Sequence, residues 1–251
     1  MNIVLGTSGW QYRSWKTEFY AGVTQSQWLE RYAESFRTVE VNNAFYRLPE
    51  ASTFTDWARR TPDDFVFSVK ASRFLTHIKR LKDPEEPVRR LVDRLQPLGT
   101  KLGPVLLQLP PTLVIDLDRL KRALECLTPH VRVAVEFRHA SWFVPETRAM
   151  LHDFNTALCL ADKNGPASPF WKTASFTYLR LHEGRARPQP CYGDTALRTW
   201  IDRLADLHTN TAYVYFNNDT KGCAVRNAAQ FHDLAEDKGI RCSKALVGVR
   251  Y

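Results

Sequence analysis

Charged and polar side chains stand at the carboxyl ends of several apolar, β-branched runs in this sequence. Glu40 lies near the end of one such run, Glu136 near the end of another, and His182 ends a third. If a nearby cation, Lys70 or Arg138, keeps one carboxylate ionised while burial raises the pKa of the other, the two glutamates can divide the general acid and general base roles. These five residues predict acid–base chemistry of the hydrolase type, on a glycosidic or phosphate ester bond.

The same residues allow a second interpretation, in which His182 joins Glu40, Glu136 or Asp162 as ligands of a divalent metal. The spacings H-x-H and H-E-x-x-H do not occur, so we expect an imidazole hydrogen-bonded to a carboxylate; we assign no metal ligand and no particular cofactor. The sequence also has no Walker loop, G-x-G-x-x-G or G-x-S-x-G motif. These absences argue against a P-loop, a Rossmann cofactor site and an α/β-hydrolase nucleophile.

Aromatic residues accompany the polar ones. Trp10 and Tyr12 follow the first run, Tyr46 follows the second and Trp142 follows the fifth. Such rings can stack on sugars or bases, or they can form the hydrophobic plug of a long first loop, and both interpretations stay open. The other side chains expected to bind the substrate are Asn42, His77, Gln108, Asp162, Arg180, Asn217 and Asn218.

The segment from Asn217 to Gly222 joins the last run to the last helix. Loops at this place in a barrel often bind phosphate at a helix N-terminus, and Arg180 and Lys221 favour an anion there. Asp219 favours the alternative, in which its side chain caps the helix. The sequence leaves both alternatives open.

The elements that must position these residues alternate between strand-like and helical patterns, as repeated βα units do around a parallel sheet. About eight runs read as strands, the number that closes a barrel, and 251 residues is close to the usual length of such a domain. We therefore predict a single-domain α/β fold, a (β/α)8 TIM-type barrel. The strand-like runs are Ile3 to Gly9, Thr38 to Ala44, Phe65 to Ala71, Val105 to Leu109, Val131 to Phe137, Thr156 to Ala161, Phe176 to His182 and Ala212 to Asn217.

Alternation along these strands predicts that the polar residues face the barrel interior. In the second run Val39 and Val41 share one face while Glu40 lies on the other, and later runs repeat this pattern. Because barrel active sites lie at the carboxyl ends of the strands, the inward polar residues are expected to converge on one mouth. In the alternative interpretation they form an internal salt-bridge network that only fills a barrel layer. Desolvation of buried charges is costly, which favours a functional site.

The helical segments have readable starts and ends. Asp83 is expected to cap a helix that has Pro84 at its first position, and the last helix ends before Gly239. The segment 163–175 has glycine and prolines with little helical periodicity, so we expect the sixth βα unit to be irregular. The barrel is predicted to span residues 1–239, followed by a tail over 240–251.

The composition, 44% hydrophobic and 25% charged, supports a folded core. A net charge of +8 makes an anionic partner plausible, either a small molecule or nucleic acid, although the basic residues are spread along helices whose faces meet solvent. No apolar run approaches the roughly 20 residues of a membrane helix, and there is no signal-peptide pattern. We expect a cytoplasmic protein without membrane contact. The five cysteines lack C-x-x-C spacing, which favours free thiols.

Several short motifs cover roughly residues 3 to 235. They are Gly6-Thr7-Ser8-Gly9-Trp10, Thr38-Val39-Glu40-Val41-Asn42 with Phe45-Tyr46, Phe67-Ser68-Val69-Lys70 with Thr76-His77, Val135-Glu136-Phe137-Arg138-His139 with Ser141-Trp142, Arg180-Leu181-His182 and Tyr215-Phe216-Asn217-Asn218. Together these motifs resemble the YecE-like family, a bacterial and archaeal domain of unknown function. The resemblance implies a barrel fold and carries no substrate or catalytic role.

Overall fold

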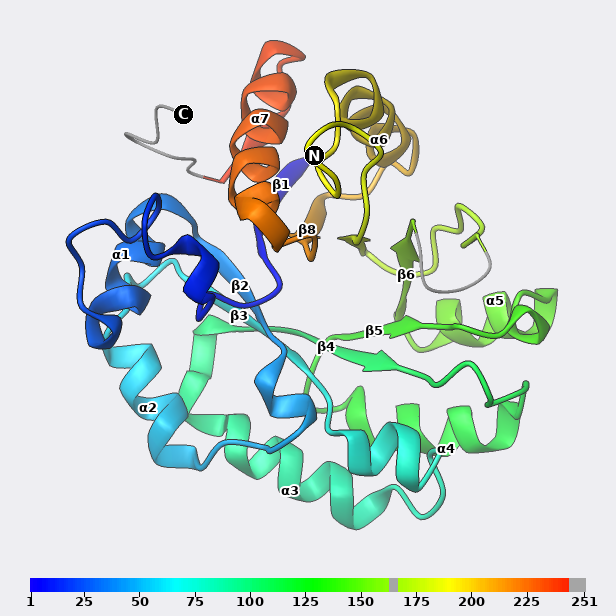
Figure 1. Cartoon of the computed structure of the whole chain (residues 1–251). Helices are drawn as coiled ribbons and strands as arrows, with labels where there is room; N and C mark the ends of the chain where they lie inside the picture. Colours follow the sequence, from blue (N-terminus) through cyan, green and yellow to red (C-terminus); the bar gives the residue numbers. More distant parts are fainter. Residues whose placement is uncertain (163–166, 244–251) are drawn as a thin grey trace.

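A computed structural model describes residues 1–162 and 167–243 of the chain, and in it parallel strands close into a barrel (Figure 1). Strands β2 to β8 pair in sequence order, β8 pairs with β1, and β1 pairs with β2. The predicted (β/α)8 barrel is confirmed. The barrel strands are β1 (Asn2–Thr7), β2 (Thr38–Val41), β3 (Val66–Lys70), β4 (Leu102–Gln108), β5 (Val133–Glu136), β6 (Ala157–Ala161), β7 (Phe176–Leu181) and β8 (Thr211–Phe216).

Seven α-helices in the described residues surround these strands, because each carries an apolar stripe at helical spacing. In α3 the stripe is Val88, Leu91 and Leu95, all buried. The helices are α1 (Trp28–Ser35), α2 (Ala51–Arg59), α3 (Glu85–Leu95), α4 (Leu117–Leu127), α5 (Pro145–Asp153), α6 (Asp194–Asp206) and α7 (Cys223–Asp237).

The start of α3 differs from the prediction. Asp83 does not cap the helix: its backbone has a φ of 41°, and Pro84 occupies the cap position without a side-chain hydrogen bond. The Asp83 carboxylate instead lies 3.3 Å from the Lys79 Nζ. A short π-helical turn, η4 (Phe74–Ile78), precedes Asp83, and no local sequence pattern predicted it.

The sixth unit is irregular, as predicted. Described residues 167–175 after β6 contain no helix, and residues 163–166 of the predicted loop lie outside the described part of the chain. The loop is held against β6 by Thr173, whose hydroxyl donates to the Thr156 carbonyl at 2.7 Å and accepts from the Leu158 amide at 2.9 Å. This unit therefore leaves one flank of the barrel covered by a loop.

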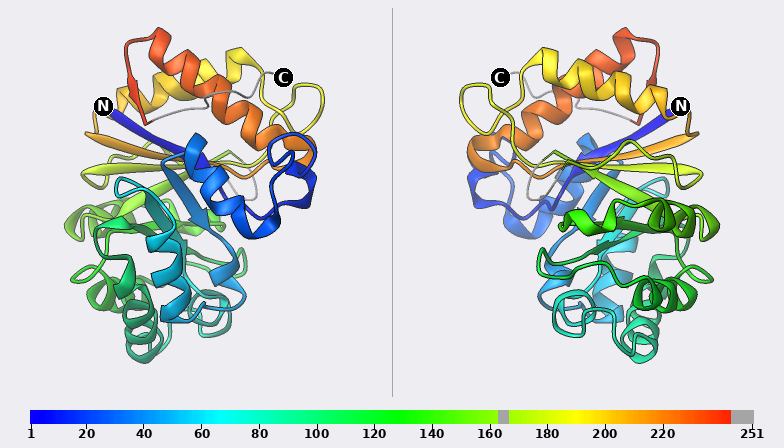
Figure 2. Two further views of the ribbon diagram at one scale, coloured as in Figure 1. Left: turned by 90° about the vertical axis from the view of Figure 1, so that its left-hand side faces the viewer. Right: turned by 90° about the vertical axis from the view of Figure 1, so that its right-hand side faces the viewer.

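A ninth strand, β9 (Arg241–Cys242), lies beside the first half of β1 (Figure 2). The β1–β2 pairing begins only at Gly6, so the edge of β1 at Ile3 is free for β9. Ser243 extends the contact, because its amide donates to the Ile3 carbonyl at 2.7 Å and its hydroxyl accepts from the Leu5 amide at 3.0 Å. The part of the predicted tail from 244 to 251 lies outside the described residues.

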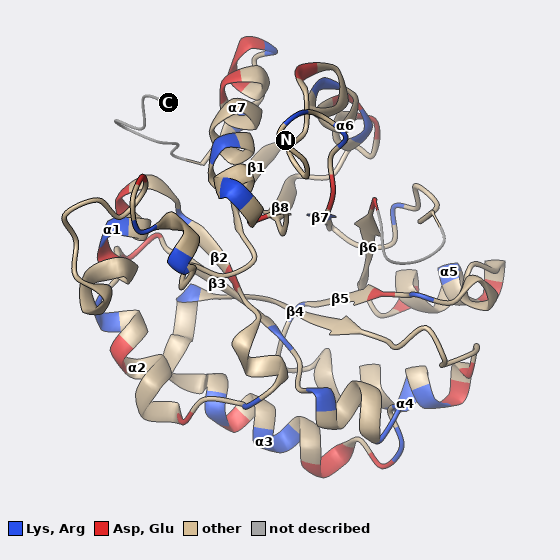
Figure 3. Ribbon diagram, in the orientation of Figure 1, with Lys and Arg blue, Asp and Glu red and all other residues tan. Residues whose placement is uncertain are grey.

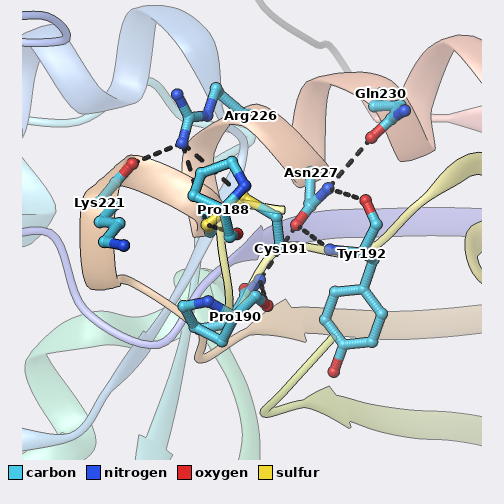
Figure 4. Close-up of a disulfide and its surroundings, with 10 residues drawn as sticks. Pro188, Pro190, Cys191, Tyr192, Lys221, Arg226, Asn227 and Gln230 are labelled. Carbon is cyan, nitrogen blue, oxygen red and sulfur yellow. Dashed lines mark hydrogen bonds between the residues drawn. A yellow bond between two sulfur atoms is a disulfide. The ribbon is translucent and has the colours of Figure 1, made fainter. Parts of the chain in front are cut away.

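Two cysteines form a disulfide, which corrects the expectation of free thiols. Cys191 in the loop between β7 and α6 is bonded to Cys223 in the first turn of α7 (Figure 4). The two are 32 residues apart, and only the fold brings them together, so sequence spacing held no sign of the bond. The other three cysteines, Cys126, Cys159 and Cys242, are free.

Two hydrophobic layers and a charged surface complete the fold. The larger layer lies between strands and helices, and a smaller one fills the barrel with side chains such as Leu106, Tyr178 and Tyr215. On the outer helices Lys and Arg are interspersed with Asp and Glu (Figure 3), as in the pair of Lys121 with Glu125. No helix in the described ranges is long and apolar enough to span a bilayer.

Candidate active site

Arg180 of β7 is the centre of a buried charge network at the carboxyl ends of the strands. Its side chain is 1% exposed and lies between Glu40 of β2 and Glu136 of β5, which are 0% and 1% exposed. The guanidinium donates to Glu40 Oε1 from Nε at 3.1 Å and from Nη2 at 2.9 Å, and to Glu136 Oε2 from Nη1 at 2.6 Å. Three strands that are far apart in sequence thus project these side chains inward to one point.

Glu136 has the richest set of partners. Its Oε1 accepts from Gln108 Nε2 at 2.9 Å and from Arg138 Nε at 2.9 Å. Burial alone would raise the pKa of Glu136, but the charges of Arg180 and Arg138 and the Gln108 hydrogen bond oppose it, and the pKa lies well below its usual range. Glu136 is therefore a fixed anion at neutral pH.

Tyrosines support Glu40 from below. Tyr178 donates its hydroxyl to Glu40 Oε2 at 2.6 Å, and burial beside this carboxylate raises the pKa of Tyr178 far above 10. One layer deeper, the Tyr215 hydroxyl bonds Thr38 at 2.8 Å and Ser68 at 2.7 Å. These inward contacts agree with the alternation of faces predicted for the strands.

Lys70, at the end of β3, lies at the edge of this network. Its Nζ is 4.1 Å from the centre of the Phe45 ring, and none of the described residues forms a hydrogen bond or ion pair with it. Burial, reinforced by Arg180, lowers the pKa of Lys70 to about 8 against the opposing effect of Glu40. His77 packs edge-on to the same ring at 4.9 Å, and burial with the nearby cations lowers its pKa to about 4.

His182 lies next to the network with one unused nitrogen. The Asn217 amide nitrogen donates to its Nδ1 at 3.0 Å, so the neutral ring carries its proton on Nε2. Burial and the charge of Arg180 lower the pKa of His182 to about 4, which keeps the ring neutral. The buried Nε2 has no hydrogen-bond partner among the described residues. A buried donor of this kind requires an acceptor, which a bound molecule can supply.

Asp162 and Tyr192 fix the backbone around His182. Asp162 Oδ1 accepts from the His182 amide at 2.8 Å, and its other oxygen accepts from the Tyr192 hydroxyl. Tyr192 also accepts from the Glu183 amide at 2.8 Å, and its own backbone is held by Asn227 (Figure 4). Sequence reasoning missed Tyr192, because it lies in a loop without strand or helix periodicity.

The remaining predicted polar residues occupy different depths. Asn42 donates to the Ser8 carbonyl at 3.2 Å, while its Oδ1 and the Ser8 hydroxyl are buried without partners in the described part of the chain. Tyr12 donates to the same carbonyl at 2.5 Å. Asn218 is removed from the network, since it donates to the Pro190 carbonyl and to Asn227, both at 3.0 Å.

The predicted aromatic residues divide into core and surface. Trp10 is 4% exposed and packs edge-on to Trp57, and Trp142 is 0% exposed and stacks on Phe137. Their ring faces are covered by protein. Tyr46, 83% exposed, projects into solvent next to Phe45.

The loop after β8 does not use Asp219 as a helix cap. Its side chain makes no capping hydrogen bond, and Gly222, with a φ of 69°, precedes the first residue of α7. In residues 1–162 and 167–243 no three His, Cys, Asp or Glu side chains converge as a metal site.

Comparison with known proteins identifies the family. The chain matches the family model described as "Protein of unknown function DUF72" over residues 4–247. The chain belongs to the DUF72 family. A DUF72 family protein of Thermotoga maritima MSB8 has a similar solved structure, with a TM-score of 0.81 and 30% identity over 94% of this chain and 100% of that one.

Curated relatives of this DUF72 chain agree with the predicted resemblance. YecE of Escherichia coli K12 is 32% identical over 142 residues, which is 56% of this chain and only half of YecE. YunF of Bacillus subtilis 168 is 24% identical over 93% of this chain and 95% of YunF. The YecE-like assignment is confirmed, and the family name brings no reaction with it.

Proposed function

We propose that this DUF72 protein is an enzyme that moves protons on a small, anionic, oxygen-rich molecule such as a sugar phosphate, bound at the carboxyl ends of the barrel strands. One observation carries the proposal. A buried, fully paired Glu40–Arg180–Glu136 cluster lies beside two groups without polar partners in the described residues, the Lys70 amine and the His182 Nε2. A network that only filled a barrel layer would not leave these groups unpaired.

The geometry argues against a pair of glutamates that act as general acid and general base. Both carboxylates are occupied by Arg180, and Glu136 is held ionised, so neither offers a proton to a leaving group. Lys70, with a pKa of about 8, can exchange a proton near neutral pH. His182, neutral with its proton on Nε2, is suited to donate a hydrogen bond to a substrate oxygen, as neutral imidazoles do in other barrel enzymes.

Charge at the rim supports an anionic substrate. Arg138 is half-buried, and it uses Nε for Glu136, which leaves its terminal nitrogens for a ligand. Burial lowers the pKa of His77, and the charges of Lys70, Arg73, Arg138 and Arg80 lower it further. This side of the mouth is therefore positive, and a phosphate or carboxylate group is expected here.

The proposal is tested by measuring the exchange of substrate C–H protons with solvent. Small sugars and their phosphate esters are incubated with the protein in D2O, and NMR follows C–H signal loss and phosphate release. We expect C–H exchange on an anionic member, reduced at least about 100-fold by Lys70→Met and by His182→Ala. Lys121→Met, which removes an exposed amine near Glu125, is the matched control. Unchanged turnover in both site variants would overturn the proposal.

Nucleic acid is the second partner predicted from charge and aromatic residues. The burial of Trp10 and Trp142 removes two of the rings on which that prediction depends. Oligonucleotide binding that weakens steeply with salt would favour nucleic acid over the small anion, since phosphate contacts release counterions.

A cytoplasmic location also stays a proposal.

A further inference from the structure

The Lys70 Nζ lies over the Phe45 ring and makes no hydrogen bond or ion pair with the described residues. Its stem leaves the carboxyl end of β3, and its Nζ rests 4.1 Å from the Phe45 ring centre. The two carboxylates that could neutralise it, Glu40 and Glu136, are both directed to Arg180. Structural lysines in this protein behave differently: Lys101 donates to the Ala58 carbonyl at 2.6 Å.

The groups facing Lys70 come from four elements. Arg180 from β7 and Arg138 after β5 oppose its positive charge, and Glu40 and Glu136 favour it. His77 from η4 is neutral and shares the Phe45 ring. Desolvation beside other cations is a recognised way to keep a lysine amine neutral and nucleophilic near neutral pH.

We propose that Lys70 forms an imine with a carbonyl carbon of the substrate, which makes the substrate an anionic aldose, ketose or oxoacid. This inference rests on the proposed function and deepens it. The Nζ lone pair forms the C–N bond, and a proton moves from this nitrogen to the carbonyl oxygen to give a carbinolamine. A second proton, taken from solvent, lets that oxygen leave as water while the nitrogen lone pair forms the C=N bond of the protonated imine, whose positive charge acidifies the adjacent C–H. Water reverses the steps and frees the lysine.

His182 and Arg138 complete the arrangement. The His182 Nε2–H is available to donate to the carbonyl oxygen while the C–N bond forms, and Arg138 is available to bind the anionic group. No reductant or oxidant is required.

Reductive trapping tests the covalent step on the intact protein. The wild type is incubated with dihydroxyacetone phosphate and cyanoborohydride, which reduces an imine to a stable secondary amine, and peptide mass spectrometry locates the adduct. We expect one adduct at Lys70, formed at least 10-fold faster than at exposed Lys121, with a rate that rises with pH through about 8. Dihydroxyacetone, the probe without phosphate, is expected to react more slowly.

Two variants make the result decisive. Lys70→Arg keeps the positive charge and cannot form the imine, so we expect the adduct to disappear while urea unfolding stays close to that of the wild type. Arg138→Met is expected to slow trapping by dihydroxyacetone phosphate by a larger factor than trapping by dihydroxyacetone. Equal adduct formation at Lys70 and Lys121 in the wild type would overturn the imine. A total amount of adduct in Lys70→Arg equal to that of the wild type would also overturn it. C–H exchange without a Lys70 adduct overturns the imine and leaves the proposed function standing.

Discussion

Arg180 lies between two buried carboxylates, and among the described residues its replacement leaves Glu40 without a counterion and Glu136 with Arg138 alone. We expect Arg180→Met to lower the free energy of unfolding by about 3–5 kcal/mol, because removing one member of a buried ion pair strands the others. Arg89→Met is the control, since Arg89 is exposed and lies 3.7 Å from Asp93. Urea unfolding measures both. A loss below about 1 kcal/mol in Arg180→Met would show that the network contributes little to stability.

His182 predicts how stability changes with pH. Its folded pKa is lowered to about 4, so on acidification the unfolded chain takes up the proton first. The contribution of neutral His182 to the free energy of unfolding is complete above about pH 6.5. It is lost as the pH falls towards 4, at up to about 1.4 kcal/mol per pH unit.

His182→Gln is expected to reduce the slope of unfolding free energy between pH 6.5 and 4.5. The slope does not vanish, since the pKa of His77 is lowered in the same direction. The carboxylate Glu136 adds its own loss only at lower pH, because its ordinary pKa lies near 4.5. Identical slopes in variant and wild type would contradict the neutral state assigned to His182.

Strand alternation was enough to find the residues of the network, and insufficient to assign their roles. Glu40, Glu136 and Arg180 lie on predicted inward faces, and the structure joins them by hydrogen bonds. Which carboxylate meets which cation depends on barrel register, which no local pattern contains. Ser8 was not singled out as a site residue, because it stood inside the predicted first strand, where a serine carries no distinctive signal.

At the level of elements, the loop between β7 and α6 shows how a segment without periodicity can matter to the site. It carries Tyr192 to Asp162, and the Cys191–Cys223 disulfide joins it to α7. Gly184 packs so closely that a Cβ there would lie 2.0 Å from the Cys191 carbonyl oxygen. Near its junction with α6, the loop is thus tied to α7 by the disulfide and to Asp162, which accepts from the His182 amide.

Breaking this disulfide is expected to destabilise the protein. Cys191→Ser should lower the free energy of unfolding by about 2–4 kcal/mol, because the crosslink restricts the unfolded chain. Cys126→Ser, which removes a free and half-buried thiol, is the matched control and should change little. Urea unfolding with and without a thiol reductant measures the effect. Equal unfolding curves for the reduced and oxidised wild type would contradict this contribution.

Elements with strong periodicity were predicted well, and their connections were not. The eight strands and the stripe on α3 follow from residue spacing, since burial demands it. The π-helical turn η4 and the positive φ of Asp83, which leaves α3 without a side-chain cap, had no signal in the local sequence. The disulfide depends on a contact across 32 residues and is equally invisible.

At the scale of the whole molecule, closure of the barrel depends partly on residues beyond α7. Strand β9 and Ser243 cover the edge of β1 that β2 leaves free. Truncation after Gly239 should therefore lower stability and speed hydrogen exchange at the Leu5 amide, which loses the Ser243 hydroxyl as acceptor. Truncation after Ser243 keeps these contacts and is the matched control. Equal exchange at Leu5 in both truncations would mean that β9 adds nothing to closure.

The same closed barrel gathers residues from strands β2, β3, β5 and β7 at one mouth, and the central claim is that this mouth binds a small oxygen-rich anion. The most direct test is a crystal structure of the protein with the sugar phosphate that raises its melting temperature most. We expect a ligand oxygen within hydrogen-bond distance of His182 Nε2, with the Lys70 amine beside the carbon that bears this oxygen and the phosphate beside Arg138. A ligand bound elsewhere, with His182 and Lys70 untouched, would contradict the account.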